Sequence, residues 1–260
     1  MLVRSWNLFH GNTLPPGRRA PIEEMIQLAT ADDPDVLCLQ EVPAWALGRF
    51  TVGDVAARPH LGPIPATAEV GRLLTATHNG VLRSLFAGQG NAIQVSTRLR
   101  VLGHAAETLN PRGFRAAAGR ALGLDAIYRL AWAKERRIVQ AVRLQREDGR
   151  TLTVANMHCT SSRDLRIPAL ELERAAAFTL EQAAPEDVVV LAGDFNVPPS
   201  SEAVQELTSE KWGFSRPGPG IDHILVRGAD VSQLRVWQPE RRARGAALLS
   251  DHAPVELDVE

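Results

Sequence analysis

Short apolar runs with polar ends, spread over the whole chain, constrain this protein more than any other feature of its sequence. Four of these endings combine amide, carboxylate and imidazole side chains: Trp6-Asn7, Gln40-Glu41, Gly193-Asp194-Phe195-Asn196 and Ser250-Asp251-His252. A desolvated carboxylate or imidazole is costly without a partner, so a buried core does not explain this much polarity at strand ends. We therefore expect the four endings to meet in one cleft.

The rest of the chain alternates strand-like and helix-like segments, without a repeat or a low-complexity linker. Apolar runs and alternation predict strands at 2–9, 36–39, 91–96, 99–107, 137–146, 151–158, 188–192, 221–226, 231–237 and 253–259. Helical periodicity predicts helices at 21–31, 164–183 and 201–207, and in part of 111–132. Prolines interrupt the pattern between 43 and 90, which leaves that segment without a prediction.

Hairpin signals decide between the α/β architectures open to such a chain. Asp148-Gly149 separates two predicted strands, and glycine accepts the positive φ of a tight turn. Strands also outnumber helices. Both observations favour a mixed α/β sandwich with antiparallel sheets over a doubly wound parallel sheet. Ser161, three residues before Asp164, is expected to cap the helix at 164–183.

Composition is that of a globular protein, with 45% hydrophobic and 23% charged residues, and 260 residues fit one domain over residues 1–260. The net charge of −1 does not favour a nucleic-acid partner, although a nuclease needs only a local basic groove. The arginines that would line such a groove are Arg112, Arg115, Arg120, Arg129, Arg136 and Arg137. The alternative interpretation is a solvated helix face, because no aromatic stacking platform is interleaved with them.

Location and assembly are predicted from what the sequence lacks. No apolar run approaches the length of a transmembrane helix, and the first strand begins almost at Met1, without a signal peptide before it. We therefore expect a cytoplasmic, monomeric enzyme. Cys38 and Cys159 lie within apolar strand patterns and are interpreted as small reduced core residues.

Asp194 and Asn196 follow a buried apolar run. Side chains two apart on a strand point to the same face, so the carboxylate and the amide are expected side by side. Gly193 permits a close approach of the backbone. Such a pair suits the activation of a nucleophile and the holding of a phosphate oxygen. The alternative is a turn in which both residues cap the following helix.

Oxygen ligands for a hard cation end two other runs. Glu41 is a carboxylate of the type that Mg²⁺ prefers, and Asn7 can supply a neutral oxygen ligand or a phosphate contact. Asp251 and His252 are adjacent, so on a strand one would reach a metal while the other reaches substrate.

Imidazoles complete the candidate set. His252 is a natural general base near neutral pH, and Asp222, at the start of a strand, can orient an imidazole through its ring N–H. His158 ends a strand and can donate a hydrogen bond to a phosphate oxygen. His223 points to the other side of the pleat and is interpreted as structural.

Together these motifs resemble the endonuclease/exonuclease/phosphatase superfamily, which includes deoxyribonuclease I, exonuclease III, neutral sphingomyelinases and inositol-polyphosphate 5-phosphatases. The resemblance rests on Trp-Asn, Gln-Glu, Asn-x-His, Gly-Asp-Phe-Asn, Ile-Asp-His and Ser-Asp-His, in this order over residues 1–260. It implies a deoxyribonuclease I-like four-layer αββα sandwich, with two mixed β-sheets flanked by helices and the site at one edge between the sheets.

The resemblance also implies a role for each residue. Glu41 would be the principal Mg²⁺ ligand, with Asn7 beside it and Asp251 near the ion, and Mn²⁺ would be an alternative metal. The remaining residues would be catalytic. Asp194 and His252 would position and deprotonate the attacking water, with the base left open between them, and Asp222 would hold His252. His158 and Asn196 would donate hydrogen bonds to phosphate oxygens.

Two departures from abasic-site endonucleases move the prediction away from DNA repair. Those enzymes usually carry an acidic residue where this chain has Phe9, and a Tyr where it has His158. We therefore predict a Mg²⁺-dependent phosphoesterase that hydrolyses a small or lipid-derived phosphodiester or phosphomonoester. A metal-dependent nuclease acting on DNA or RNA is the first alternative, and an inactive binding scaffold is the second.

Overall fold

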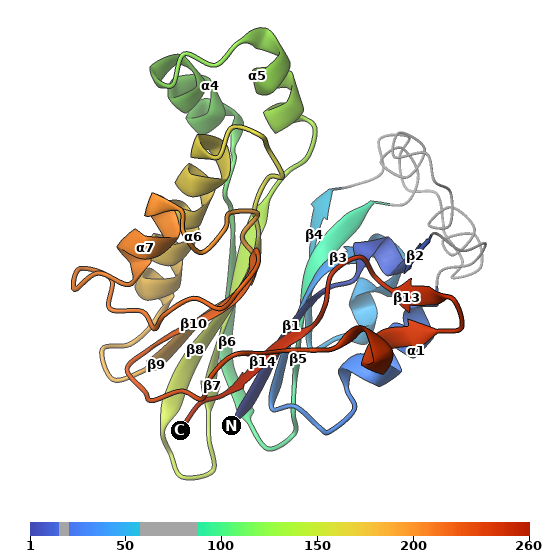
Figure 1. Cartoon of the computed structure of the whole chain (residues 1–260). Helices are drawn as coiled ribbons and strands as arrows, with labels where there is room; N and C mark the ends of the chain where they lie inside the picture. Colours follow the sequence, from blue (N-terminus) through green and yellow to red (C-terminus); the bar gives the residue numbers. More distant parts are fainter. Residues whose placement is uncertain (16–20, 58–87) are drawn as a thin grey trace.

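The computed structural model describes residues 1–15, 21–57 and 88–260. Two β-sheets pack face to face, and helices cover their outer faces (Figure 1). This is the predicted four-layer αββα sandwich, so the fold class is confirmed. A single domain over residues 1–260 stays a prediction.

The first sheet has the strand order β11-β14-β1-β3-β5-β4. Its strands are β1 Leu2–Asn7, β3 Val36–Pro43, β4 Val52–Ala57, β5 Gln89–Val95, β11 Arg235–Val236 and β14 Val255–Asp258. Strand β1 pairs in parallel with β3 and antiparallel with β14. The first and last strands are therefore neighbours, which brings motifs from both ends of the chain together.

The second sheet has the order β10-β9-β8-β7-β6. Its strands are β6 Arg100–Thr108, β7 Ile138–Gln145, β8 Thr151–His158, β9 Val188–Asp194 and β10 Asp222–Arg227. Strands β8 and β9 are parallel, whereas the other neighbours are antiparallel. A third, small sheet contains β2 Thr13–Leu14, β12 Ala243–Arg244 and β13 Ala247–Leu249.

Helix α1 covers the first sheet, and α6 and α7 cover the second (Figure 1). The α-helices are α1 Ile22–Ala29, α4 Arg112–Ala121, α5 Ala126–Ala133, α6 Arg166–Gln182 and α7 Glu202–Leu207, and the 3₁₀ helices are η1 Phe9–Gly11, η2 Ala44–Arg49 and η3 Pro239–Arg242. In the part of the chain that the structure describes, no helix has the length and apolar character needed to cross a membrane.

Strand β3 is apolar without alternation because both of its faces are buried. Val36 and Cys38 pack between the two sheets, whereas Leu37 and Leu39 pack in the cluster beneath α1. Cys38 is a free, buried thiol, and so is Cys159, which confirms their interpretation as reduced core residues.

Most predicted elements lie within a few residues of the observed ones, and the exceptions have local causes. The predicted strand at 231–237 pairs only over Arg235–Val236 and at a bridge from Val231. Ser161 does not cap α6, because the helix begins at Arg166, whose backbone N–H donates to Asp164 Oδ1. Of the segment 43–90, residues 58–87 lie outside the described part.

Strand register places polar ends from both sheets at one edge. Asn7 lies beside Gln40 in the parallel β1–β3 pair, and His158 beside Asp194 in the parallel β8–β9 pair. Strand β10 starts at the same edge, with Asp222 opposite Asp194. The strand ends that the sequence singles out are therefore neighbours.

Gly193 is required where β9 approaches β8. Its φ is +140°, and a Cβ at this position would overlap the carbonyl oxygen of Met157. Strain and overlap of this kind each cost about 1–3 kcal/mol. We expect Gly193→Ala to lower the free energy of unfolding by about 3 kcal/mol in urea denaturation. Gly103→Ala is the matched control, because a Cβ there meets nothing within 4 Å, and an equal effect of both changes would contradict the argument.

Candidate active site

All eight residues predicted for the site lie in one cluster. Each has an atom within 4.0 Å of another member, through the pairs Asn7–Glu41, Asn7–Asp194, Glu41–His158, His158–Asp194, Asn196–Asp194, Asp194–His252, His252–Asp222 and His252–Asp251. They come from β1, β3, β8, β9, β10, the segment after β9 and the turn before β14. The tertiary structure thus joins residues that are up to 245 positions apart in the sequence.

Glu41 lies at an irregularity of β3, where the register with β5 shifts between Leu39 and Val42. Its φ is +52°, and such bulges re-aim a side chain next to active sites. His10 Nε2 is 2.9 Å from Glu41 Oε2. Burial alone would raise the pKa of Glu41, but the charge and hydrogen bond of His10 lower it well below its usual range, with help from His158 and Arg137. The carboxylate is therefore ionised and ready to bind a cation.

Asn7 is fully buried, and its amide nitrogen faces the carboxylates of Glu41 and Asp194. Nδ2 donates to Asp194 Oδ2 at 3.0 Å and to Glu41 Oε1 at 3.4 Å, while Oδ1 accepts from the Phe9 backbone N–H. In this orientation Asn7 offers hydrogen atoms to the cleft, and its oxygen is bonded to the following turn.

Asp194 is the buried centre of the cluster, with about 1% of its surface exposed. Burial raises the pKa of Asp194 to about 7, with a contribution from the charge of Asp222, while His252 and Asn7 oppose the shift. Near neutral pH the group is therefore poised between its two protonation states, which suits proton transfer.

His158 is oriented by Arg137, a residue that the sequence did not assign to the site. Arg137 Nη1 lies 3.1 Å from Nδ1 and 3.4 Å from Nε2 of His158, and a guanidinium can only donate. The shorter contact assigns Nδ1 as the acceptor and leaves the proton on Nε2. Nε2 faces Asp194 Oδ2 at 3.5 Å. Burial and the charge of Arg137 lower the pKa of His158 well below its usual range, so the ring is a neutral hydrogen-bond donor.

Arg137 corrects the interpretation of the arginine series as one solvated face. Its backbone N–H donates to Asn110, and its guanidinium is buried against Glu135 and His158. Arg112, Arg120, Arg129 and Arg136 are exposed as expected. A signal for Arg137 exists in the sequence, because it comes directly before β7 at the edge where the other polar ends lie. His10 was also missed, although it is three residues after Asn7.

His252 and Asp222 form a close pair on the other side of Asp194. Nδ1 of His252 lies 2.8 Å from Asp222 Oδ2, which leaves Nε2 facing Asp194 Oδ2 at 3.8 Å. Burial disfavours the imidazolium, but the hydrogen bond and charge of Asp222 outweigh it and raise the pKa of His252 to about 9. His223, as expected, is buried and structural, with Nε2 near the Val197 carbonyl.

The Ser250-Asp251-His252 turn is tied to the first strand. Ser250 Oγ donates to the Asn7 carbonyl at 2.7 Å, and Trp6 Nε1 donates to the His252 carbonyl at 2.9 Å. These bonds explain why Trp and Ser accompany the candidate residues in the first and last motifs. Asp251 and His252 precede β14 instead of lying on it, and Asp251 is the more exposed of the two.

Asn196 does not share a strand face with Asp194, so that prediction was wrong. Strand β9 ends at Asp194, and Asn196 has a φ of +53°. Its backbone N–H donates to Asp194 Oδ1, and its amide nitrogen donates to the Cys159 carbonyl, both at 3.0 Å. Asn196 therefore links the segments that follow β8 and β9.

Strained backbone is concentrated at this edge. Of the seven non-glycine residues with positive φ in the described part, five are Phe9, His10, Glu41, Asn196 and Ser250, all in or next to the cluster. Each such conformation costs about 1–3 kcal/mol and persists where surrounding contacts impose it, most often at functional sites.

The cluster has the donors for a cation. Ligand atoms of Asp194, Asp222 and His252 lie within 4.8 Å of one another. The Glu41 carboxylate is near this group, because Asn7 and His158 each contact both Glu41 and Asp194. Asp222 Oδ1 is buried, and within the described residues it has no hydrogen-bond partner. Oxygen-rich donors with an unsatisfied carboxylate oxygen fit a divalent metal.

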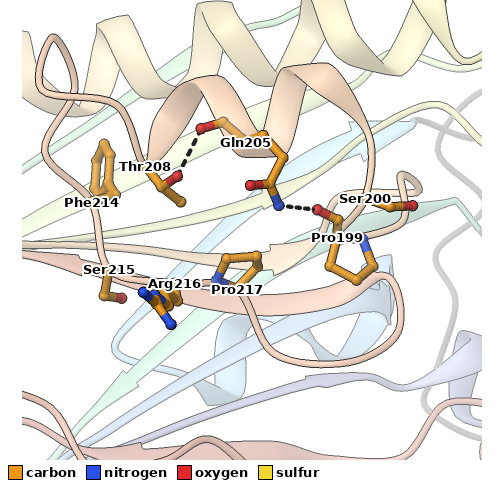
Figure 2. A pocket seen from close by; sticks show the side chains of 8 residues that line it. All are labelled: Pro199, Ser200, Gln205, Thr208, Phe214, Ser215, Arg216 and Pro217. Carbon is orange, nitrogen blue, oxygen red and sulfur yellow. Dashed lines mark hydrogen bonds between the residues drawn. The ribbon is translucent and has the colours of Figure 1, made fainter.

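A separate pocket of about 910 Å³ lies beside α7 (Figure 2). It is lined by Pro199, Ser200, Gln205, Thr208, Phe214, Ser215, Arg216 and Pro217. Two hydrogen bonds, drawn as dashed lines, join residues that line the pocket: Gln205 donates to the Pro199 carbonyl, and Thr208 donates to the Gln205 carbonyl. The pocket shares no residue with the cluster above.

Solved structures share this architecture over the whole chain. A functionally unknown conserved protein from Enterococcus faecalis V583 aligns with a TM-score of 0.66 and 16% identity, covering 100% of this chain and 99% of that one. D. rerio TDP2 complexed with a single-strand DNA product aligns with a TM-score of 0.64 and 12% identity, covering 100% of this chain and 98% of that one. Bacteroides thetaiotaomicron mannosyl-6-phosphatase aligns with a TM-score of 0.61 and 15% identity, covering 100% of this chain and 99% of that one. No curated protein sequence matches significantly.

Two mixed sheets with carboxylates and imidazoles at one edge define a deoxyribonuclease I-like hydrolase. The chain belongs to the Endonuclease/Exonuclease/phosphatase family, whose sequence model matches residues 5–252. Members of this family are metal-dependent hydrolases of phosphate esters, and this protein is an enzyme of that class.

The His252–Asp222 pair gives a pH-dependent prediction. Because the folded-state pKa of His252, about 9, is above the ordinary value of 6.5, the pair stabilises the fold fully below pH 6.5 and loses this effect as the pH rises through 9. We expect Asp222→Asn to bring the pKa of His252 down toward 6.5 in NMR titration of metal-free protein. The stability difference from wild type should then shrink between these pH values. Asp54→Asn, which removes a carboxylate paired with His104, is the control; an unchanged His252 titration in Asp222→Asn would contradict the assignment.

Proposed function

We propose that this enzyme is a Mg²⁺-dependent phosphoesterase that hydrolyses a small or lipid-derived phosphodiester or phosphomonoester with an activated water. The observation that carries the proposal is the continuous chain of side chains from Glu41 through His158 and Asp194 to His252, with neighbouring atoms 3.5–3.8 Å apart. Such a chain offers cation ligands, a proton acceptor and phosphate donors within one substrate's reach.

Glu41, Asn7 and Asp251 would hold the divalent ion, as the family resemblance implies, although the ligand atoms that lie within 4.8 Å of one another are those of Asp194, Asp222 and His252. When bound, it would neutralise charge on the scissile phosphate and stabilise the leaving oxygen. His10 Nε2 lies 2.9 Å from Glu41 Oε2, so a cation has to compete with His10 or accept it as a ligand. Asn7 would have to release the Phe9 backbone N–H to present its oxygen.

Water activation would fall to the Asp194–His252–Asp222 group. Asp222 fixes the ring of His252 through Nδ1, so that Nε2 points at the space beside Asp194. A water bound by both groups would lose its proton to whichever of them is unprotonated. Near neutral pH this is the Asp194 carboxylate, because His252 can accept a proton only above its pKa of about 9. General-base catalysis of this kind typically contributes about 10²–10⁴ in rate.

Phosphate oxygens would be held by the neutral donors His158 and Asn196, with the buried guanidinium of Arg137 behind His158. His158 presents its Nε2 proton toward the carboxylates. The Asn196 side-chain amide donates one hydrogen bond to the Cys159 carbonyl and has a second N–H for a phosphate oxygen. Arg137 holds His158 in place and adds positive charge behind it. Donors fixed in position before the reaction stabilise charge as it develops in the transition state.

A nuclease is the main alternative, because TDP2 in the comparison is bound to a single-strand DNA product. The mannosyl-6-phosphatase in the same comparison acts on a small phosphomonoester by its name. The net charge of −1 favours the second kind of substrate. A monomeric, cytoplasmic enzyme remains our expectation, and an inactive scaffold is the outcome to exclude.

The substrate class is tested with a generic bis-aryl phosphodiester, an aryl monophosphate and plasmid DNA, each with Mg²⁺, with Mn²⁺ and with chelator. We expect metal-dependent turnover of a small ester, and a loss of at least about 10³-fold in Asp194→Asn. This change keeps the size of the buried side chain but leaves one acceptor oxygen for two donors, the Asn7 amide and the Asn196 backbone N–H. Cleavage of DNA alone would favour the nuclease. Absence of metal-dependent turnover would favour the scaffold.

Glu41→Ala tests the metal assignment. Loss of the ionised carboxylate should raise the metal concentration for half-maximal activity by at least about tenfold, because a carboxylate is the strongest hard ligand available. The readout is activity against Mg²⁺ concentration, with Glu107→Ala, a carboxylate on β6, as the control. An unchanged metal requirement would contradict the role of Glu41.

A further inference from the structure

The helical hairpin formed by α4 and α5, residues 111–136, extends beyond the sandwich at the upper end of the molecule (Figure 1). Helix α5 has the sequence AIYRLAWA, which is apolar on more than one face. A short helix that is apolar all round is normally buried on all sides. This one is not.

The inner face of α5 is packed. Trp132 is buried with Leu124 and Ile167, its ring meets Phe114 edge-on at 5.9 Å, and its Nε1 donates to Glu171. The hairpin is therefore a folded element with its own small core. Its apolar content is not explained by that core alone.

The outer face of α5 is exposed. Ile127 is 76% exposed and Leu130 is 72% exposed, and at a spacing of three residues they lie on the same face of the helix. Lys134 follows Leu130 by four residues on that face. These are the two most exposed large hydrophobic side chains of the described residues, and they lie together.

The hairpin as a whole is positively charged. Residues 111–136 contain six Arg or Lys against two Asp or Glu, a net charge of +4 in a chain whose total is −1. Arg112, Arg120 and Lys134 are exposed. Exposed apolar side chains among basic ones are the pattern of an element that lies in the interface of an anionic membrane. A nucleic acid would use the positive charge but would not need Ile127 and Leu130.

The hairpin leaves the sandwich at the same edge as the candidate site. Thr108 at the end of β6 pairs with Ile138 at the start of β7, and Val139 pairs with Met157, next to His158. Arg137, at the base of the hairpin, contacts His158 directly. A surface bound by the hairpin would therefore lie near the sheet edge that carries the candidate site.

We propose that the α4–α5 hairpin docks this protein onto an anionic lipid surface. Ile127 and Leu130 enter the apolar boundary of the bilayer, and Arg120 and Lys134 contact the phosphate-bearing headgroups. This binding does not require hydrolysis, so it can be tested whether or not the proposed function holds.

The test is co-sedimentation of the full chain with vesicles of phosphatidylcholine alone and of phosphatidylcholine with phosphatidylserine. We expect binding to the anionic vesicles only, weakening as salt is added. Ile127→Ser with Leu130→Ser should lower the vesicle affinity at least about tenfold, because each side chain loses its apolar transfer. Arg120→Gln with Lys134→Gln should lower it about tenfold.

The control is Val101→Ser with Leu102→Ser, which removes two exposed apolar side chains from β6 and should leave vesicle binding unchanged. Thermal unfolding checks that every variant is folded. Equal binding of wild type and the Ile127/Leu130 variant would overturn the proposal. So would binding to single-stranded oligonucleotides without vesicle binding, or a dimer in size-exclusion chromatography that this variant abolishes.

Discussion

Hydrogen bonds from the Asn156 side chain cross the space between the two sheets and fix how the sheets meet. From β8, Nδ2 donates to the carbonyls of Leu39 on β3 and Ala92 on β5, both at 2.9 Å, and Oδ1 accepts from Gln40 Nε2 at 2.8 Å. All of these groups are buried, so an unmade bond would cost about 1–3 kcal/mol. Asn156 lies two residues before His158, and its partner Gln40 is next to Glu41. These hydrogen bonds therefore help to set the distance between His158 on the second sheet and Glu41 on the first.

The pKa values of the candidate residues depend on this close approach of the two sheets. Because the sheets meet here, carboxylates from both are brought out of water, and burial raises the pKa of Asp194 while nearby imidazoles keep Glu41 ionised. The same crowding makes His158 neutral and His252 positively charged, since one faces Arg137 and the other Asp222. Groups of one chemical type thus acquire different roles from their neighbours, as enzymes require.

The α4–α5 hairpin contributes to this arrangement through its base. Asn110 and Glu135 hold Arg137, and Glu171 on α6 connects Trp132 of the hairpin with Thr160, which follows the β8 strand end. The hairpin is therefore fixed by hydrogen bonds to the segment that follows the strand carrying His158.

The sequence by itself determined the strands, the layer architecture and the eight candidate residues, because apolar runs with polar ends are local patterns and their order resembles one family. It did not determine which face each side chain presents. Asn196 leaves the strand in a left-handed conformation, Glu41 lies in a bulge and Ser161 does not cap α6, since register and tertiary contacts decide these details. His10 and Arg137 are placed beside the candidate site only by the folded chain. Their partners, Glu41 and His158, are 31 and 21 positions away, and although Arg137 precedes β7, no local pattern encodes either contact.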